Sequence, residues 1–564
     1  MPPELPELVA RLPEGAVTES TGPDAPQDQP TWIVRREALL DVCRELQSNR
    51  ATRYDLLLEM FGMDYPDRDE RFEAVYHLYS IPSGERLRLK VPLAESDPVL
   101  PTVTTVWKGA NWYEREAFDM FGLRFDGHPN LRRILTHEAF QGHPLRKDYD
   151  PARRWILTED KMYMPKLEAP EKGDSMFERM TINIGPSHPA MHGTFRMIAM
   201  VDGEEIVASE VEIGYLHRCF EKMSETHTWQ QVIPYTDRLN YCSSFINNVG
   251  YCRTVERMLG VEAPPKAVWA RTILSEFSRV MDHCVANGST LVDVGALTNF
   301  WYFFQPREEI YGLLESVCGA RLTVSACRIG GLLADLPPDF VARCRHLLEF
   351  IPPLIDDIET LVDKNRIWLD RSVGIAAISG EDAVNWGWTG PCLRAAGVAF
   401  DSRKAHPYDL YDTVEWEVPV LRGGDVYDRY RLRMLEIRQS LAIIRQLVDR
   451  GMPEGPYVVD DPHVALPPKD ACYNQMESMI YHFKLIMDGI QVPPGELYGF
   501  VEGANGELGF YCVSDGSGKP YRVRVRPPCF PLFSTFPTLM QGHTISDAIA
   551  TLGGLNVIAG ELER

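Results

Sequence analysis

The sequence pattern changes sharply between residues 151 and 178. The stretch ARRWILTEDKMYMPKLEAPEKGDSM is rich in proline and charge and has no hydrophobic periodicity, which is typical of a linker between domains. A chain of 564 residues also exceeds the usual size of one domain. We therefore predict a flexible tail over 1–30, an α+β docking domain over 31–150, a linker over 151–178 and a large domain over 179–564.

The composition indicates a folded, acidic protein. Hydrophobic residues make up 45% of the chain and charged residues 24%, which is typical of proteins with large cores. The net charge of −22 argues against non-specific binding of nucleic acid. No run approaches the roughly 18 to 20 apolar residues of a membrane-spanning helix, and the N-terminus lacks the pattern of a signal peptide. We therefore expect a protein of the cytosol, or one docked to the cytosolic face of a membrane.

The cysteines do not follow the pattern of a metal or cluster site. The chain has 12 cysteines, and none of them form a C-x-x-C pair. Most stand in apolar runs, so we predict buried, reduced thiols. A chain that bound its own iron–sulfur cluster would usually show clustered cysteines.

The first domain has the pattern of a small α+β fold. A helical pattern begins at Trp32, and residues 72–93 predict two strands joined by a Pro-Ser-Gly turn. A further helix is predicted over 112–122, with Gly122 as its end. We expect docking and assembly from this domain, because its helical charges fit an ion-paired face better than a site; they are Glu114, Arg115, Glu116 and Asp119.

The second domain begins with strands and continues with helices. A strand is predicted over 179–185, followed by a hairpin around Asp202-Gly203. Residues 265–288 place apolar side chains at helical spacing, with Gly288 as the end of the helix. The predicted fold is mainly helical with peripheral β-sheets, since helical patterns also cover 340–363, 425–450 and 472–488 before two strands, ELGFYCVSD and PYRVRVRPP.

Two histidines lie four residues apart in the segment TINIGPSHPAMHGTFRM. Pro189 pushes His188 toward extended backbone, and Gly193 ends any turn that contains His192, so a regular helix is disfavoured. No glutamate follows the first histidine, and the H-E-x-x-H pattern of zinc proteases is therefore absent. We predict a tight loop that begins at Gly185-Pro186, rather than a catalytic metal site.

Other polar residues suggest what such a loop could do. The sequence PYTDRLNYCSSF supplies Tyr241 close to Asp237 and Arg238, and Asp293 stands in a mostly apolar run. Imidazole, phenol and carboxylate are the groups that donate protons to a carbonyl during its reduction. A loop whose histidines bind only backbone remains the alternative.

Several short sequences in the second domain are similar to those of one family. They are GPSHPAMHG, IGYLHRCFEK, DRLNY, RIGG, DVYDRY, GELGFYCVSDG and PYRVRVRPP, and they resemble the quinone-site subunit of respiratory complex I. Upstream, WYEREAFDMFGLRFDGHPNLRRILTHEAFQGHPLRKDYD resembles the peripheral subunit that normally precedes it. The chain thus resembles the fused C/D subunits of bacterial proton-translocating NADH–quinone oxidoreductase. The resemblance implies a second domain like the nickel–iron hydrogenase large subunit, without the metal site.

The resemblance also implies roles for individual residues. His192 and Tyr241 match the ligands of the quinone head group, and Asp293 matches the aspartate that partners the histidine. His188 matches a supporting histidine of the same loop, which also contains Gly185, Pro186 and Gly193. Arg218 matches an arginine near the terminal 4Fe–4S cluster of a partner subunit. Thr323 stands where many relatives have a cluster-proximal histidine, which puts histidine-based tuning of the cluster in doubt.

The implied activity belongs to a complex rather than to this chain alone. The family passes electrons from the partner's cluster to quinone, and membrane partners couple this reaction to proton transport. The resemblance implies that the chain binds no cofactor by itself, that quinone is its substrate, and that other subunits use FMN and NADH. Its implied partners are the cluster-bearing subunit, other peripheral-arm subunits and a membrane-embedded quinone-channel subunit, with no nucleic acid. The implied location is the cytoplasmic side of the inner membrane.

Two other functions fit parts of the sequence. A nickel–iron hydrogenase-type large subunit would need two C-x-x-C pairs, whereas the corresponding regions hold only Cys219 and Cys529. A non-catalytic assembly scaffold would not need His192, Tyr241 and Asp293 together. The apolar stretch CFPLFSTF fits either a quinone channel or ordinary core; its aromatic residues are Phe530, Phe533 and Phe536.

Overall fold

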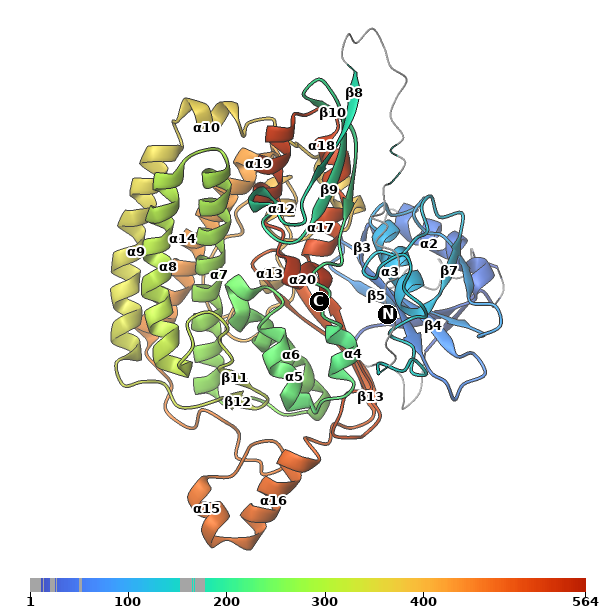
Figure 1. Cartoon of the computed structure of the whole chain (residues 1–564). Helices are drawn as coiled ribbons and strands as arrows, with labels where there is room; N and C mark the ends of the chain where they lie inside the picture. Colours follow the sequence, from blue (N-terminus) through green and yellow to red (C-terminus); the bar gives the residue numbers. More distant parts are fainter. Residues whose placement is uncertain are drawn as a thin grey trace.

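The computed structural model describes residues 12, 13, 15–20, 26, 28–49, 53–152, 165, 167 and 178–564. A small domain built on a β-sheet packs against a larger, mainly helical domain (Figure 1). The predicted linker and the first eleven residues of the predicted tail lie largely outside the described residues.

The small domain contains a five-stranded sheet with the order β1-β2-β5-β4-β3. Strands β2 and β5 are parallel, and the other neighbours are antiparallel. Strand β1 and Asp28 fall within the stretch predicted as a tail, yet β1 pairs with β2 and Asp28 forms a 2.6 Å ion pair with Arg88. The elements are β1 (Val17–Glu19), β2 (Thr31–Val34), η1 (Arg36–Ala38), α2 (Leu39–Ser48), β3 (Leu56–Asp64), β4 (Phe72–Tyr79), β5 (Arg86–Leu93), β6 (Val99–Pro101), α3 (Ala110–Phe121) and β7 (Arg124–Asp126).

Most of the predicted elements of the small domain are present. Strands β4 and β5 confirm the predicted pair, and α3 ends at Gly122, which adopts the left-handed conformation with φ 77°. The prediction that a helical pattern begins at Trp32 is wrong. Trp32 belongs to β2, because Trp32 and Val34 face the core while Ile33 is exposed, and α2 begins only at Leu39.

Asp119 and Glu116 of α3 are ion-paired as predicted, but all four charged residues of the helix are buried. Asp119 forms a 2.6 Å ion pair with Arg133 and accepts hydrogen bonds from three backbone N–H groups. Glu114 accepts hydrogen bonds from the Thr102 hydroxyl at 2.6 Å and from a backbone N–H. Burial raises the pKa of Glu114 to about 8. The helix therefore lies in the interior rather than at an exposed face.

The two domains share one interior. Trp112 of α3 contacts Phe530 of the large domain with ring centroids 5.3 Å apart, and both rings belong to one apolar cluster. Buried ion pairs cross the same boundary: Glu116 binds Arg524 and Arg564, and Arg524 also lies 3.1 Å from Glu59. Apolar contacts and buried ion pairs together fix the orientation of the small domain.

The large domain is organised around long helices. Helices α7 (Pro265–Asp293), α8 (Leu297–Cys318), α9 (Phe340–Val362) and α14 (Val426–Arg450) run side by side (Figure 1). Between them and the small domain lies the antiparallel sheet β13 (Gly495–Glu502), β14 (Glu507–Ser514) and β15 (Arg522–Arg526). The other elements are α4 (Phe220–Ser224), α5 (Trp229–Thr236), η3 (Tyr241–Ser243), α6 (Ser244–Leu259), β11 (Cys327–Arg328), β12 (Gly331–Leu332), α10 (Arg366–Asp370), α11 (Gly380–Asn385), α12 (Gly390–Ala395), α13 (Ser402–Ala405), α17 (Cys529–Ser534), α18 (Phe536–Met540), α19 (Ile545–Leu555) and α20 (Ala559–Glu563).

Helix α7 is longer than predicted. Gly288 does not end it, because the helix continues to Asp293. A Cβ at Gly288 would lie 3.4 Å from the side chains of Phe300 and Phe303, so the glycine lets α8 approach closely. Packing between the two helices outweighs the low helix propensity of glycine. As a result, Asp293 stands at the C-terminus of a long, fixed helix.

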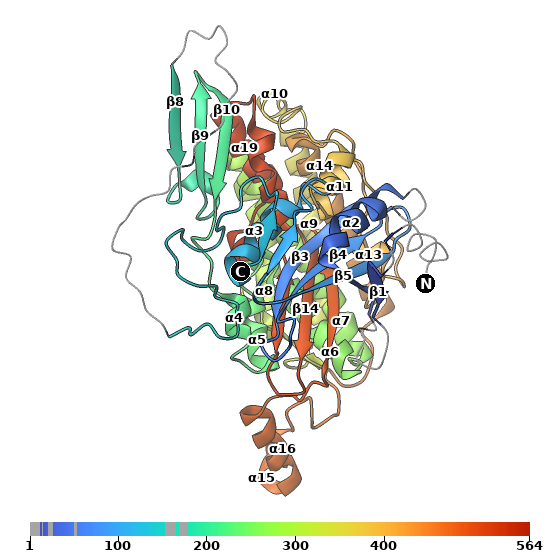
Figure 2. The ribbon, with the colours of Figure 1, turned by 90° about the vertical axis from the view of Figure 1, so that its right-hand side faces the viewer.

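A second sheet and a helical hairpin flank this bundle. Strands β8 (Arg179–Ile184), β9 (Arg196–Asp202) and β10 (Glu205–Glu212) form a sheet with the order β10-β9-β8, which confirms the predicted strand and hairpin. The predicted helix over 472–488 is two helices, α15 (Lys469–Asn474) and α16 (Met476–Met487), because Gln475 adopts extended backbone. The pair projects from the body of the protein (Figure 2).

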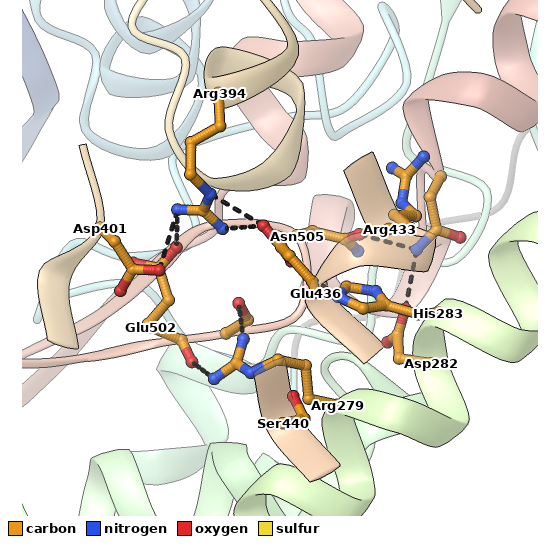
Figure 3. A network of polar contacts seen from close by, with 12 residues as sticks. Arg279, Asp282, His283, Arg394, Asp401, Arg433, Glu436, Ser440, Glu502 and Asn505 are labelled. Atoms are coloured by element: carbon orange, nitrogen blue, oxygen red, sulfur yellow. Dashed lines mark hydrogen bonds and ion pairs between the residues drawn. The ribbon is translucent and has the colours of Figure 1, made fainter. Parts of the chain in front are cut away.

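A buried polar network joins the helices to the sheet (Figure 3). His283 of α7 lies 2.8 Å from Glu436 of α14, and Arg394 contacts both Glu436 and Glu502 of β13. Burial alone would raise the pKa of Glu436, but Arg394 and His283 hold it well below its usual range. Asn556 donates to Asp282 at 2.8 Å and so ties the segment before α20 to α7.

The cysteines and the aromatic residues of CFPLFSTF lie mainly in the interior. Cys219 is exposed, Cys318 and Cys472 are half-buried, and the remaining thiols are buried, as predicted for most of them. Phe530, Phe533 and Phe536 are also buried, which confirms the core alternative for these rings.

Candidate functional site

The histidine segment forms a tight, non-helical loop after β8, as predicted. His188 has extended backbone, with φ −141° and ψ 130°, and the Ala190 N–H donates to its Nδ1 at 3.3 Å. A single 3-10 turn, η2 (Pro189–Met191), follows, and His192 adopts the left-handed conformation with φ 44°. Gly185 has φ 87°, and a Cβ there would lie 2.1 Å from the carbonyl oxygen of Phe195, so the loop requires glycine.

The loop brings His192 to the end of α7. The His192 Nε2 atom lies 2.6 Å from Oδ2 of Asp293, and both side chains are largely buried. The two atoms are in close polar contact, although Oδ2 of Asp293 has no hydrogen bond of standard geometry. A carboxylate at a helix C-terminus is disfavoured by the helix dipole, so a positively charged partner would stabilise Asp293 there. The pairing that the resemblance implies is therefore present in the fold.

Tyr241 lies in a second irregular segment, between α5 and α6. It begins the short turn η3, which the Asn240 side chain caps by accepting a hydrogen bond from the Cys242 N–H at 3.2 Å. Tyr241 is half-buried and packs against the large apolar cluster that spans both domains. Burial raises the pKa of Tyr241 to about 12, with smaller contributions from Cys242 and Asp282. The phenol thus keeps its proton at neutral pH.

Asp237 and Arg238 are next to Tyr241 in sequence but have other roles. Asp237 is buried and accepts a hydrogen bond of 2.5 Å from the Asn248 amide. Burial raises the pKa of Asp237 to about 6. Arg238 points outward, and its guanidinium donates to the carbonyl of Pro234 at 2.5 Å. These two residues hold the turn.

Arg218 lies against the Tyr241 segment. Its Nη2 donates to the carbonyl oxygens of Arg238 at 2.7 Å and of Gly560 at 3.2 Å, and its backbone N–H donates to Arg564 at 3.0 Å. Partial burial lowers the pKa of Arg218, and the charge of Arg238 adds to this effect. Thr323 is half-buried in the loop between α8 and β11.

The short helix α20 connects the predicted site segments. A Cβ on Gly193 would lie 3.1 Å from Cβ of Ala559, and a Cβ on Gly560 would lie 2.5 Å from the Arg238 carbonyl oxygen. The histidine loop, the Tyr241 segment and Arg218 therefore meet around the same helix. Sequence reasoning missed α20, because the small residues Ala559 and Gly560 carry no chemical signal of their own.

The sequence also matches known proteins along most of its length. Residues 32–154 match the family of the respiratory-chain NADH dehydrogenase 30 kDa subunit, and residues 293–564 match that of the 49 kDa subunit. The fused C/D subunit of the NADH-quinone oxidoreductase of Bdellovibrio bacteriovorus is 50% identical over 513 residues, which cover 91% of each chain. The chain belongs to the family of fused C/D subunits of NADH-quinone oxidoreductase. The C/D subunits from Acidiphilium cryptum and Edwardsiella ictaluri are 38% and 39% identical, over 95% and 98% of this chain and 93% and 96% of theirs.

Membership of the C/D family confirms the resemblance to complex I. The chain is a peripheral-arm subunit of respiratory complex I, and other subunits accompany it. Among the helices that the structure describes, none is long and apolar enough to cross a membrane. Within the same described residues, no group of three or more His, Cys, Asp or Glu side chains is arranged to hold a metal ion.

Proposed function

We propose that this chain forms much of the quinone-reduction site of its complex, between the histidine loop and the Tyr241 segment. The observation that carries the proposal is the 2.6 Å contact between His192 and Asp293, which joins a non-helical loop to the end of α7. Both segments also meet at α20, next to Arg218. A quinone head group has two carbonyl oxygens, and His192 and Tyr241 supply one donor for each of them.

Each donor has a distinct part in the reduction. The quinone receives two electrons and two protons and becomes a quinol. Tyr241 holds its proton at neutral pH, because its pKa is about 12, so it donates a hydrogen bond to the oxidised ring and a proton only to the strongly basic reduced oxygen. His192 supplies the second proton, and Asp293 orients its imidazole and balances its charge. Both residues regain protons from water before the next turnover.

The electrons reach the site from outside the chain. Arg218 is fixed by two carbonyl oxygens, so its guanidinium keeps a constant position and charge at the edge of the site. We assign it to the neighbourhood of a 4Fe–4S cluster that a partner subunit holds, while FMN and NADH belong to other subunits. A positive charge near a cluster raises its reduction potential.

Exposed apolar residues support contact with a membrane-embedded partner. Leu297 and Trp301 of α8, which begins just after Asp293, are 55% and 59% exposed. Apolar side chains gathered near a site mark an interaction surface. We propose that they are covered by a quinone-channel subunit at the cytoplasmic side of the inner membrane.

The predicted likeness to hydrogenases remains a statement about the fold. We infer that the large domain has the architecture of a nickel–iron hydrogenase large subunit, with long helices beside a small sheet. Its two candidate nickel regions retain Cys219, which is exposed, and Cys529, which accepts a hydrogen bond from the Ile558 N–H. One thiol in each region gives half of the ligands that a four-thiolate nickel site needs.

The decisive test replaces the two donors in the assembled complex. We expect Tyr241→Phe and His192→Ala each to lower quinone-dependent NADH oxidation by at least about tenfold, since a positioned acid contributes 10²–10⁴-fold. Electron transfer from NADH to a hydrophilic artificial acceptor should stay unchanged, because it does not use the quinone site. Tyr473→Phe is the matched control, since this ring is 81% exposed on the projecting hairpin. Normal quinone turnover in both site variants would refute the proposal.

A further inference from the structure

We propose that Ala559 and Gly560 of α20 are positioning residues that set the separation between the histidine loop and the Tyr241 segment. The inference rests on the proposed quinone site and adds the element that holds its two donors at the right spacing. Neither residue has a functional side chain, so their role is purely geometric.

Ala559 determines how closely the histidine loop approaches. It is buried, and a Cβ on Gly193 would lie only 3.1 Å from the Ala559 Cβ. Gly193 directly follows His192, whose left-handed backbone leaves the imidazole facing Asp293. The Ala559 methyl group therefore packs beneath Gly193, next to the residue that carries the imidazole. A larger or smaller side chain at position 559 would shift the loop.

Gly560 determines how closely the Tyr241 segment approaches. A Cβ at this position would lie 2.5 Å from the carbonyl oxygen of Arg238 and 2.8 Å from that of Leu239. These carbonyls precede Tyr241 by three and two residues. Glycine is required here because of the close approach of backbone. The carbonyl of Gly560 also accepts the Arg218 guanidinium at 3.2 Å, so the same residue fixes the third group of the site.

Helix α20 is itself held by contacts at its middle and its C-terminal end. Glu561 accepts a hydrogen bond from the Cys529 N–H at 3.0 Å, and the Glu563 carboxylate accepts one from the Leu216 N–H at 2.5 Å. The Glu563 carbonyl oxygen lies 2.7 Å from Nδ1 of His217. A five-residue helix would not be stable alone, but these contacts place it rigidly between the segments. Neighbouring positions 559 and 560 can thus act as one spacer.

The first test enlarges the side chain at position 560, which faces the Tyr241 segment. Gly560→Ala should push the Tyr241 segment away and raise the KM for quinone at least tenfold in the assembled complex, because small displacements of reacting groups have large kinetic effects. NADH oxidation by an artificial acceptor should not change. Gly554→Ala is the matched control, since its Cβ would lie 3.4 Å or more from its nearest neighbours, which are atoms of Val426 in α14. An unchanged KM in Gly560→Ala complex would overturn the inference.

A second variant guards against loss of folding. Ala559→Gly removes the methyl group under Gly193 without adding an atom, so the complex should assemble. We expect a severalfold higher KM for quinone, because the histidine loop gains freedom. If Ala559→Gly complex assembles and keeps both its KM and its kcat, the spacer role of Ala559 is wrong.

A double-mutant cycle separates positioning from general destabilisation. If Gly560→Ala acts through the phenol, it should have little further effect in a Tyr241→Phe background but its full effect in a His192→Ala background. For Ala559→Gly we expect the opposite: little further effect in a His192→Ala background and the full effect in a Tyr241→Phe background. Equal effects in all backgrounds would show a merely structural role and reject the inference. The proposed function fails separately, when Tyr241→Phe and His192→Ala themselves leave quinone turnover unchanged.

Discussion

The Arg86 Nη2 atom lies 2.6 Å from Oε2 of Glu507, and this buried ion pair joins β5 of the small domain to β14 of the large one. A second hydrogen bond of 2.9 Å between the same groups makes the contact bidentate. Burial alone would raise the pKa of Glu507, but Arg86 lowers it to about 2. The pair therefore fixes the relative position of the domains only while both charges are present.

Loss of Arg86 should destabilise the whole chain. Arg86→Met leaves the Glu507 carboxylate buried without its main partner, which typically costs about 3–5 kcal/mol. Denaturant unfolding should show this loss. Arg343→Met is the matched control, since the pair of Arg343 with Asp339 is about half exposed and should contribute less than about 1 kcal/mol. Equal stabilities of the two variants would contradict the prediction.

Glu114 should make stability fall as the pH rises. Its pKa is raised from 4.5 to about 8 by burial, so the folded chain keeps a proton that the unfolded chain releases. The stabilisation is complete below about pH 4.5 and is lost as the pH rises toward 8, by an amount on the order of 5 kcal/mol. Glu114→Gln should flatten this pH dependence and stabilise the chain at pH 8. Glu381→Gln, at an exposed position, should leave the slope unchanged.

Asp293 should matter for turnover more than for assembly. Asp293→Asn keeps the size of the side chain but removes the charge that lies 2.6 Å from His192. We expect a loss of at least about tenfold in quinone reduction, since the imidazole loses the carboxylate that orients it. Asp370→Asn, whose side chain is 67% exposed on α10, serves as the control. Wild-type turnover by Asp293→Asn complex would exclude this role.

Two glycines near the end of α8 should respond oppositely to alanine. A Cβ would meet open space at both Gly312 and Gly319, but Gly312 lies inside the helix whereas Gly319 caps it with φ 79°. Gly312→Ala should stabilise the chain by about 0.5–1 kcal/mol through higher helix propensity. Gly319→Ala should destabilise it by about 1 kcal/mol, because alanine disfavours the left-handed conformation. Urea unfolding of the two variants would check both signs.

The sequence predicted local structure well and long-range contacts poorly. Pro189 and Gly193 impose their backbone conformations locally, so the tight histidine loop could be predicted. The prediction that α7 ends at Gly288 was wrong, because the helix accommodates this glycine through close packing against the aromatic residues of α8. The ion pairing of Glu116 could be predicted, but its partners Arg524 and Arg564 could not, because they come from the far end of the chain.

The candidate site shows the same limit. His192, Tyr241 and Asp293 could be named because their chemistry and their family resemblance mark them. The helix that brings their segments together could not be predicted, since Ala559 and Gly560 matter only because their small side chains let neighbouring backbone approach closely. Contacts of that kind become visible only in the folded chain.

The shared aromatic interior has a consequence for how the protein must be made. Trp112 and Phe530 cover each other across the boundary between the two domains. Either domain synthesised alone would therefore expose an aggregation-prone apolar face to water. Joining the halves in one polypeptide supplies the two faces in equal number and at high local concentration. Fusion thus guarantees stoichiometry before any other component of the complex arrives.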